Sequence, residues 1–216
     1  MVRSTNLKRL SKKSRQVRDP EATKAHILDA AMEEFAKHGL SGARTEAIAA
    51  RSGVTKAMIY YYFQSKEGLY QAVLHQLDFQ INNMMPQINL DQLPADAALK
   101  HVIRAAIAYE VKHPYLGMIL FQEAIQNQGK YYKQTNWQES FKQVIGILER
   151  GIAAGCFRRL DPLMTAIHIA GVCTFYFDAY ENLKYVMPNL DLRSPEMIDK
   201  HTEAAIALLL AGVQQK

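Results

Sequence analysis

The feature that most constrains the fold of this 216-residue chain is the spacing of its apolar residues. Apolar side chains recur at every fourth position from Leu69 to Ile81, and the same spacing occurs from Ile27 to Phe35. This period is that of one face of an α-helix. Proline or glycine separates the periodic stretches, and we find no convincing strand. The sequence therefore predicts an all-α fold.

Residues 45–66 predict a helix, a tight turn and a second helix. Two short apolar-periodic segments flank Ser52-Gly53-Val54, and neither is long enough to form a domain alone. An earlier helix, started by Asp19 and Pro20 and ended near Gly39, would support them. Two helices joined by a short glycine-containing turn form a helix-turn-helix unit, whose second helix enters the major groove of DNA.

The remaining helices are predicted from the same spacing and the same interruptions. A long helix at about 65–85, stopped by Pro86, would connect the helix-turn-helix unit to a body, with a loop at 87–94. The body is predicted to contain about five helices, at 95–112, 115–127, 130–154, 162–185 and 195–213.

The residues around this unit also resemble a known family. In order and spacing, the chain is similar to the DNA-binding domain of bacterial regulators of the TetR family (TetR/AcrR type). The resemblance covers about residues 19–74. The matching positions are Ile27-Leu28, Ala30-Ala31, Phe35, Gly39, Thr45, Ile48-Ala49, Gly53-Val54-Thr55, Ile59-Tyr60, Tyr62-Phe63 and Ser65-Lys66-Glu67.

The resemblance implies a division of the chain into three parts. Residues 19–66 would form an N-terminal three-helix, helix-turn-helix DNA-binding domain, and residues 67–216 a C-terminal helical bundle for effector binding and dimerisation. Residues 1–18 carry seven basic side chains and no acidic one, which predicts a disordered basic arm. The arm either lies along DNA or is a solvated leader.

The charge distribution agrees with a nucleic-acid partner for the first third. Residues 1–66 hold 13 Lys and Arg against 6 Asp and Glu, a net charge of +7. The rest holds 13 against 15, a net charge of −2, which gives the total of +5. A basic end attracts phosphates in a salt-dependent way, although many mildly basic proteins bind no nucleic acid.

The start of the second short helix supplies the first DNA-binding candidates. Thr55 and Lys56 begin this helix, whose N-terminal residues reach base edges. Lys56 either donates to guanine or holds a phosphate. Thr45 is expected to be the N-cap of the preceding helix, and the resemblance also gives it a phosphate contact.

The tyrosine run Tyr60-Tyr61-Tyr62 and Lys66 complete the DNA-binding set. By resemblance, Tyr60 is a half-buried phosphate contact, Tyr61 lies at a variable position that can touch bases, and Tyr62 replaces a more usual histidine. Three adjacent aromatic residues cannot share one helix face, so we expect Tyr61 to be the most exposed. Lys66, just after the Ser65 cap, is a second phosphate candidate.

The body is rich in large soft side chains that would line a mostly apolar effector pocket. Glu123 and His168 would be among its few polar anchors, and any single Met or aromatic residue is more often plain core than pocket lining. The candidates are Met84, Met85, Tyr109, Phe121, Glu123, Trp137, His168 and Phe175.

The last two predicted helices carry apolar stripes that one small body should not expose, so a two-fold interface is expected to bury them. The candidates for this homodimer interface are Ile167, Gly171, Thr174, Ile206, Leu209, Leu210 and Val213.

Other classes of protein and site receive little support. Cys156 and Cys173 form neither a CxxC pair nor a disulfide framework, and the longest apolar runs are too short to cross a bilayer. A single Glu110-x-x-His113 spacing lacks the second motif of a di-iron bundle, so no metal or cofactor is predicted. No enzyme motif is present, and a cytoplasmic, non-enzymatic protein without membrane contact is expected.

The sequence thus predicts a repressor that binds a palindromic operator in double-stranded DNA as a dimer. A small, largely apolar effector would release it. The alternatives are a helical enzyme or carrier with an incidental basic end, and a protein that coats DNA without sequence preference.

Overall fold

The computed structural model of the protein describes residues 19–84, 89–135 and 137–215. Within these ranges the chain forms ten α-helices, two short 3-10 helices and no strand, which confirms the all-α prediction. The α-helices are α1 (Pro20–Gly42), α2 (Thr45–Ser52), α3 (Lys56–Phe63), α4 (Lys66–Met84), α5 (Ala95–Lys112), α6 (Leu116–Asn127), α7 (Trp137–Ala153), α8 (Pro162–Asp178), α9 (Tyr180–Val186) and α10 (Pro195–Val213). The basic arm lies outside the described residues.

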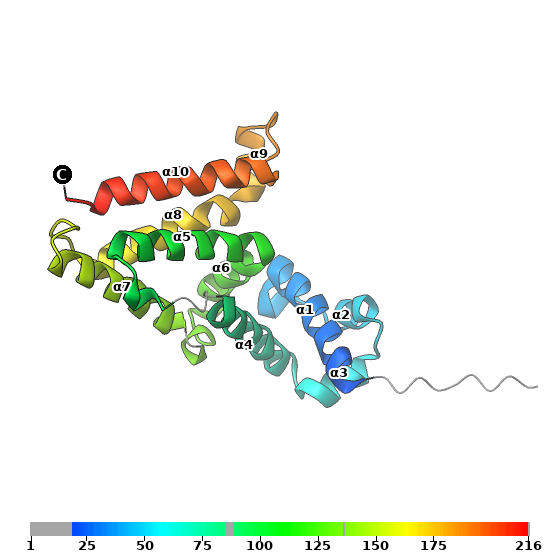
Figure 1. Ribbon diagram of the computed structural model, residues 1–216. Helices are drawn as coiled ribbons and strands as arrows, with labels where there is room; N and C mark the ends of the chain where they lie inside the picture. Colours follow the sequence, from blue (N-terminus) through cyan, green and yellow to red (C-terminus); the bar gives the residue numbers. More distant parts are fainter. Residues whose placement is uncertain (1–18, 85–88, 136, 216) are drawn as a thin grey trace, which may run out of the picture.

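The three N-terminal helices lie together at one end of the molecule, and α4 leads from them to the body (Figure 1). The Asp19 side chain caps α1 by accepting a hydrogen bond from the Glu21 amide at 3.0 Å. The backbone leaves helical geometry at Gly39, where the helix was predicted to end, and a further short helical stretch reaches Gly42. α1 contacts α2, α4 and α6.

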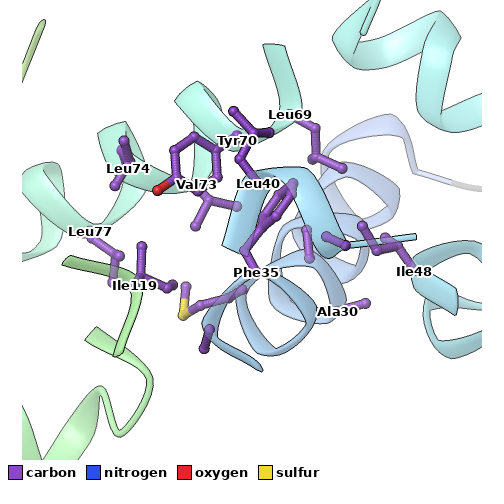
Figure 2. Close-up of a cluster of buried hydrophobic side chains, with 14 of the residues drawn as sticks. Ala30, Phe35, Leu40, Ile48, Leu69, Tyr70, Val73, Leu74, Leu77 and Ile119 are labelled. Carbon is purple, nitrogen blue, oxygen red and sulfur yellow. The ribbon is translucent and has the colours of Figure 1, made fainter. Parts of the chain in front are cut away.

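A first hydrophobic cluster joins these helices to α6. Phe35 of α1 is fully buried and packs edge-on against Tyr70 of α4, with ring centroids 4.9 Å apart. Ile48 of α2 and Ile119 of α6 belong to the same cluster (Figure 2). The N-terminal helices therefore share a core with α4 and α6, across the domain boundary predicted at residue 66.

A second cluster forms the core of the body. It combines buried side chains of α5, α7, α8 and α10, among them Leu99, Leu148, Ile169 and Leu210. α5 contacts α7, α8 and α10, and α10 lies along the outer side of the body (Figure 1). Between the two clusters, Tyr109 of α5 donates a hydrogen bond to the Leu77 carbonyl of α4 at 2.6 Å.

Two predicted helices of the body differ from the structure. The helix predicted at 130–154 begins only at Trp137; the residues before it form a short 3-10 helix at Tyr132–Gln134, and the amides of Tyr131 and Tyr132 donate to the Glu123 carboxylate. The helix predicted at 162–185 is divided at Ala179 into α8 and α9.

Candidate DNA-binding surface and ligand cavity

The turn between α2 and α3 depends on Gly53. Its φ of 69° places it in the left-handed region, which glycine adopts without steric cost, and its amide bonds to the Ala49 carbonyl. Thr55 then caps α3, since its hydroxyl accepts a hydrogen bond from the Met58 amide at 3.3 Å. Ile48 and Ile59 are fully buried beneath the turn, so the core fixes the angle between the two helices.

α3 presents its tyrosines on different faces. Tyr61 is 81% exposed and Tyr60 is 39% exposed, whereas Tyr62 is half-buried against the first hydrophobic cluster. Tyr62 also lies beneath the ammonium of Lys24, which is 5.9 Å from its ring centroid. Tyr61 is therefore the tyrosine of α3 that is freest to meet another molecule.

Lys56 is held at the start of α3 by a neighbouring acid. Its ammonium pairs with the Glu46 carboxylate of α2 and lies 5.8 Å from the centroid of the Tyr60 ring. The hydrogen bond to Glu46 raises the pKa of Lys56, and the same bond lowers the pKa of Glu46. If a phosphate reached Lys56, the ammonium would exchange the Glu46 carboxylate for another anionic partner. Both side chains are solvent-exposed, so the exchange would leave no unpaired charge buried.

Two of the DNA-binding candidates, Lys66 and Thr45, are engaged within the protein. The Lys66 ammonium donates to the carbonyl oxygens of Ser41 and Ala43, both at 3.2 Å, and so ties the start of α4 to the end of α1. Thr45 is buried, and Arg44 occupies the N-cap position of α2 without a side-chain hydrogen bond. The prediction of Thr45 as N-cap was therefore wrong by one residue.

The body contains a cavity of about 130 Å³ between α5, α7 and α8. Its walls are mostly apolar, and Glu110 contributes the one carboxylate among the lining residues. The lining residues are Val102, Ile103, Ala105, Ala106, Tyr109, Glu110, Trp137, Ser140, Phe141, Val144, Ala166, Ile169, Ala170, Cys173 and Thr174.

Glu110 is only 6% exposed, and its carboxylate has no hydrogen-bond or ion-pair partner among the described residues. Burial, together with the nearby charge of Asp178, raises the pKa of Glu110 to about 8. Burial also raises the pKa of the neighbouring Cys173 thiol to about 12. The cavity thus holds an acid that is neutral over much of the physiological range.

Asp178, at the end of α8, connects the cavity wall to α6. Its Oδ1 atom is buried without a hydrogen-bond partner among the described residues, and it packs against Gly117 of α6. A Cβ atom built on Gly117 would lie 1.5 Å from that oxygen, so a side chain at position 117 would force the Asp178 carboxyl group to move. Burial raises the pKa of Asp178, and the nearby Thr174 hydroxyl opposes the increase.

The other end of α6 is bonded to the DNA-binding half. Glu123 accepts hydrogen bonds from the Tyr70 hydroxyl at 3.0 Å, from Asn127 Nδ2 at 2.6 Å and from the Tyr131 amide at 2.7 Å. The Gln126 side chain accepts a hydrogen bond from the Ser41 hydroxyl at 2.9 Å. α6 therefore contacts both the cavity side of the body and the end of α1.

Sequence comparison decides the family. The profile of bacterial regulatory proteins of the tetR family matches residues 27–73, and that of the tetracyclin repressor-like C-terminal domain matches residues 95–209. The chain belongs to the TetR family. The HTH-type transcriptional repressor NicS of Pseudomonas putida is 33% identical over 162 residues, which cover 72% of this chain and 76% of NicS.

Other TetR-family relatives and solved structures agree. The HTH-type transcriptional repressor SCO4008 of Streptomyces coelicolor is 32% identical over 71% of this chain and 79% of its own length. The hemolysin II transcriptional regulator HlyIIR has a TM-score of 0.67 at 23% identity, over 92% of this chain and 100% of HlyIIR. FadR from Bacillus subtilis, solved with stearoyl-CoA, has a TM-score of 0.68 at 22% identity, over 88% of this chain and 99% of FadR. These structures show the same fold.

The structure brings together only part of the effector pocket that was predicted from the sequence. Tyr109 and Trp137 line the cavity, whereas Glu123 is buried in the network with Tyr70. Phe121, on α6, is exposed and lies away from the cavity. Met85 lies outside the described residues, and so does the side chain of Met84.

Two further pocket candidates of the TetR-type body lie on its surface. His168 and Phe175 line a shallow hollow between α8, α9 and α10, together with Ile167 and Gly171. Thr174, predicted at the dimer interface, instead lines the inner cavity. His168, Phe175 and Thr174 were therefore predicted on the wrong faces of α8. Small and apolar residues occur on both faces of this helix, so the sequence does not show which face points inward.

The residues of α10 that were predicted at the dimer interface also lie on the inward face of their helix. Ile206, Leu209, Leu210 and Val213 are buried in the core of their own subunit and are not available to a partner. The exposed apolar face of this helix is formed by Ala204, Ala207, Leu208 and Ala211. A single helix with apolar residues on most of its circumference gives no signal of which stripe faces inward.

The described residues form neither a cluster of metal ligands nor a membrane-spanning helix. No group of three or more His, Cys, Asp or Glu side chains in these ranges lies close enough to hold a metal ion. None of the helices described is both long and apolar enough to cross a membrane.

Proposed function

We propose that the protein is a dimeric repressor that binds an inverted-repeat operator and is released when a small effector occupies the cavity between α5, α7 and α8. The observation that carries the proposal is α3, a short helix that follows the Gly53 turn with Thr55, Lys56 and Tyr61 at its surface. The names of NicS and SCO4008 as repressors support the direction of regulation.

The exposed side chains of α3 suggest two roles at the DNA. Thr55 and Tyr61 would touch base edges, and Tyr60 would contact a phosphate, with Tyr62 fixing the helix against the core. Lys56 would leave Glu46 for a phosphate or a guanine edge. Lys66 and the first amides of α2 beside Thr45 would add backbone contacts, although Lys66 has only its remaining N–H to offer.

Substitution of Tyr61 tests these roles. Tyr61→Ala should reduce the discrimination between operator and random duplex by about 1–3 kcal/mol, because a base contact is lost while the phosphate contacts remain. Fluorescence anisotropy titrations with both duplexes measure it. Lys142→Ala, which removes an exposed charge of α7, should leave both affinities unchanged. Equal weakening on both duplexes by Tyr61→Ala would contradict a base contact.

The dimer would form through the exposed apolar faces of α8 and α10. Phe175 is 62% exposed, and Leu208 of α10 is 64% exposed. α8 also exposes the apolar side chains of Leu163, Met164 and Ile167. An apolar area of this kind is typically buried against a second subunit.

Phe175→Glu should dissociate the dimer, because it would place a charge in the buried centre of the interface. Sedimentation velocity at micromolar concentration should show the mass of a dimer for the unaltered protein and of a monomer for the variant. Phe79→Glu, at an exposed phenylalanine of α4, is the matched control and should remain dimeric. A Phe175→Glu variant that stays dimeric would place the interface elsewhere.

Release of DNA would pass through α6. A ligand in the cavity acts on α8, whose Asp178 packs against Gly117 at the start of α6. The far end of α6 is bonded to Ser41 of α1 and, through Glu123, to Tyr70 of α4. A shift of α6 would change the spacing of the two copies of α3, and a coupling of about 1–3 kcal/mol is typical of such links.

A further inference from the structure

We propose that the cavity takes a small, ring-sized molecule with a protonated basic nitrogen, and that the Glu110 carboxylate is the counter-ion of that nitrogen. The inference rests on the proposed function, in which this cavity is the effector site.

The size and walls of the cavity define the ligand body. A volume of about 130 Å³ is close to that of apolar cavities of about 150 Å³ that bind benzene, so one ring with a short substituent fits. Tyr109, Trp137 and Phe141 contribute aromatic rings to the wall. Aromatic rings pack well against the apolar ring of a ligand, and they also stabilise a cation that lies over their faces.

Glu110 is the acid in this wall, and it lacks a partner among the described residues; the indole N–H of Trp137, also in the wall, is buried without one as well. Its side chain is more than nine-tenths buried and forms no hydrogen bond or ion pair within the described residues. The contrast is Glu123, which is buried to a similar degree but accepts hydrogen bonds from Tyr70, Asn127 and Tyr131. Buried carboxyl groups are normally hydrogen-bonded, so the unused acceptor of Glu110 indicates a donor supplied by a ligand.

The charged surroundings of Glu110 favour a cation over an anion. From α8 it is faced by Asp178, whose charge disfavours a second negative charge, and by the Cys173 thiol. Tyr109 precedes it on α5 and His113 follows just after the end of that helix, and the Tyr109 hydroxyl is already bonded to the Leu77 carbonyl. The α7 wall contributes no charged group. A cationic ligand would stabilise both carboxylates in their ionised form, whereas a carboxylate ligand would add a third acid.

Three probes of similar shape test the inference: benzylammonium, benzyl alcohol and benzoate. Trp137 is the single tryptophan of the chain and lines the cavity, so its fluorescence reports binding, and calorimetry on the full chain gives the affinities. Benzylammonium should bind at least about tenfold more tightly than benzyl alcohol, as expected of a charge-assisted hydrogen bond, and benzoate should bind most weakly.

The variant Glu110→Gln should remove this preference. It should bind benzylammonium and benzyl alcohol with affinities within about twofold of each other, and its binding of benzyl alcohol would show that the cavity is intact. Glu149→Gln, an exposed acid of α7, is the matched control and should retain the preference. A preference that survives in Glu110→Gln, equal or tighter binding of either other probe, or binding of none would overturn the inference.

The pH dependence separates a cation from a neutral ligand. Binding of benzylammonium should strengthen from about pH 6 to pH 8, because it requires the ionised form of Glu110 and releases the proton. A neutral ligand that accepts a hydrogen bond from protonated Glu110 would bind more weakly as the pH rises. Affinity for benzylammonium that falls over this range would contradict the inference.

Operator binding is measured on the same samples without probe. Loss of the cation preference with operator binding intact would overturn only the ligand assignment. A cation preference in a protein without operator binding would overturn the proposed regulatory function and leave the site itself supported.

Discussion

Phe35→Ala is expected to lower the free energy of unfolding by about 3–5 kcal/mol. Phe35 is fully buried at the centre of the first hydrophobic cluster, where its ring meets Tyr70 edge-on and where α1, α4 and α6 converge (Figure 2). The truncation would leave a cavity in the core that joins the DNA-binding helices to the body. Urea denaturation followed by circular dichroism measures the change.

Phe79→Ala is the matched control for this substitution. Phe79 lies on α4, a helix of the same cluster, but its side chain is 69% exposed. Its truncation should change the free energy of unfolding by no more than about 0.5 kcal/mol. Equal effects of the two substitutions would contradict the burial of Phe35.

Glu110→Gln is expected to reduce the dependence of stability on pH between about pH 4.5 and pH 8. In the folded protein, burial raises the pKa of Glu110 from 4.5 to about 8, so it keeps its proton in this window, whereas the unfolded chain has lost it. The unaltered protein should therefore lose up to about 1.4 kcal/mol of stability per pH unit as the pH rises through the window. Glutamine has no proton to lose, so this contribution disappears.

Denaturant titrations at several pH values between 5 and 8 measure the effect. A residual slope of the same sign is expected in Glu110→Gln, because burial also raises the pKa of Asp178. Glu149→Gln, which alters an exposed acid, should keep the full slope. The same slope in Glu110→Gln and in the unaltered protein would contradict the prediction. It would mean that the Glu110 carboxylate is already ionised and hydrated in the folded protein.

Helices with local start and stop signals were predictable from the sequence. The bounds of α5 and α10 agree with the prediction, because proline marks each start and the apolar spacing ends where the helix ends. The start of α1 at Asp19-Pro20 and the turn at Gly53 follow from the same local chemistry. The helix-turn-helix unit was therefore identifiable from short-range rules.

Features set by distant contacts were not predictable in this way. The segment before α7 is held by Glu123 of α6, which accepts hydrogen bonds from the amides of Tyr131 and Tyr132. The inward faces of α8 and α10 depend on which helices pack against them, since both helices are apolar on more than one side.

The sequence draws attention to Glu110 only through its spacing to His113 and does not indicate its position in the cavity wall. Its setting among apolar residues of α5 was the available signal, but the cavity itself is formed by three helices that are distant in sequence.

The central claim is that two copies of α3, held by one dimer, recognise one DNA site. Selection of duplexes from a random-sequence pool, followed by sedimentation of the complex, tests it most directly. The selected duplexes should share an inverted repeat with half-sites about 34–36 Å apart, or a multiple of that, and should bind two subunits. Their affinity should exceed that of random duplex by at least about 10³-fold. A pool without a shared sequence, or a complex with one subunit per site, would contradict the claim.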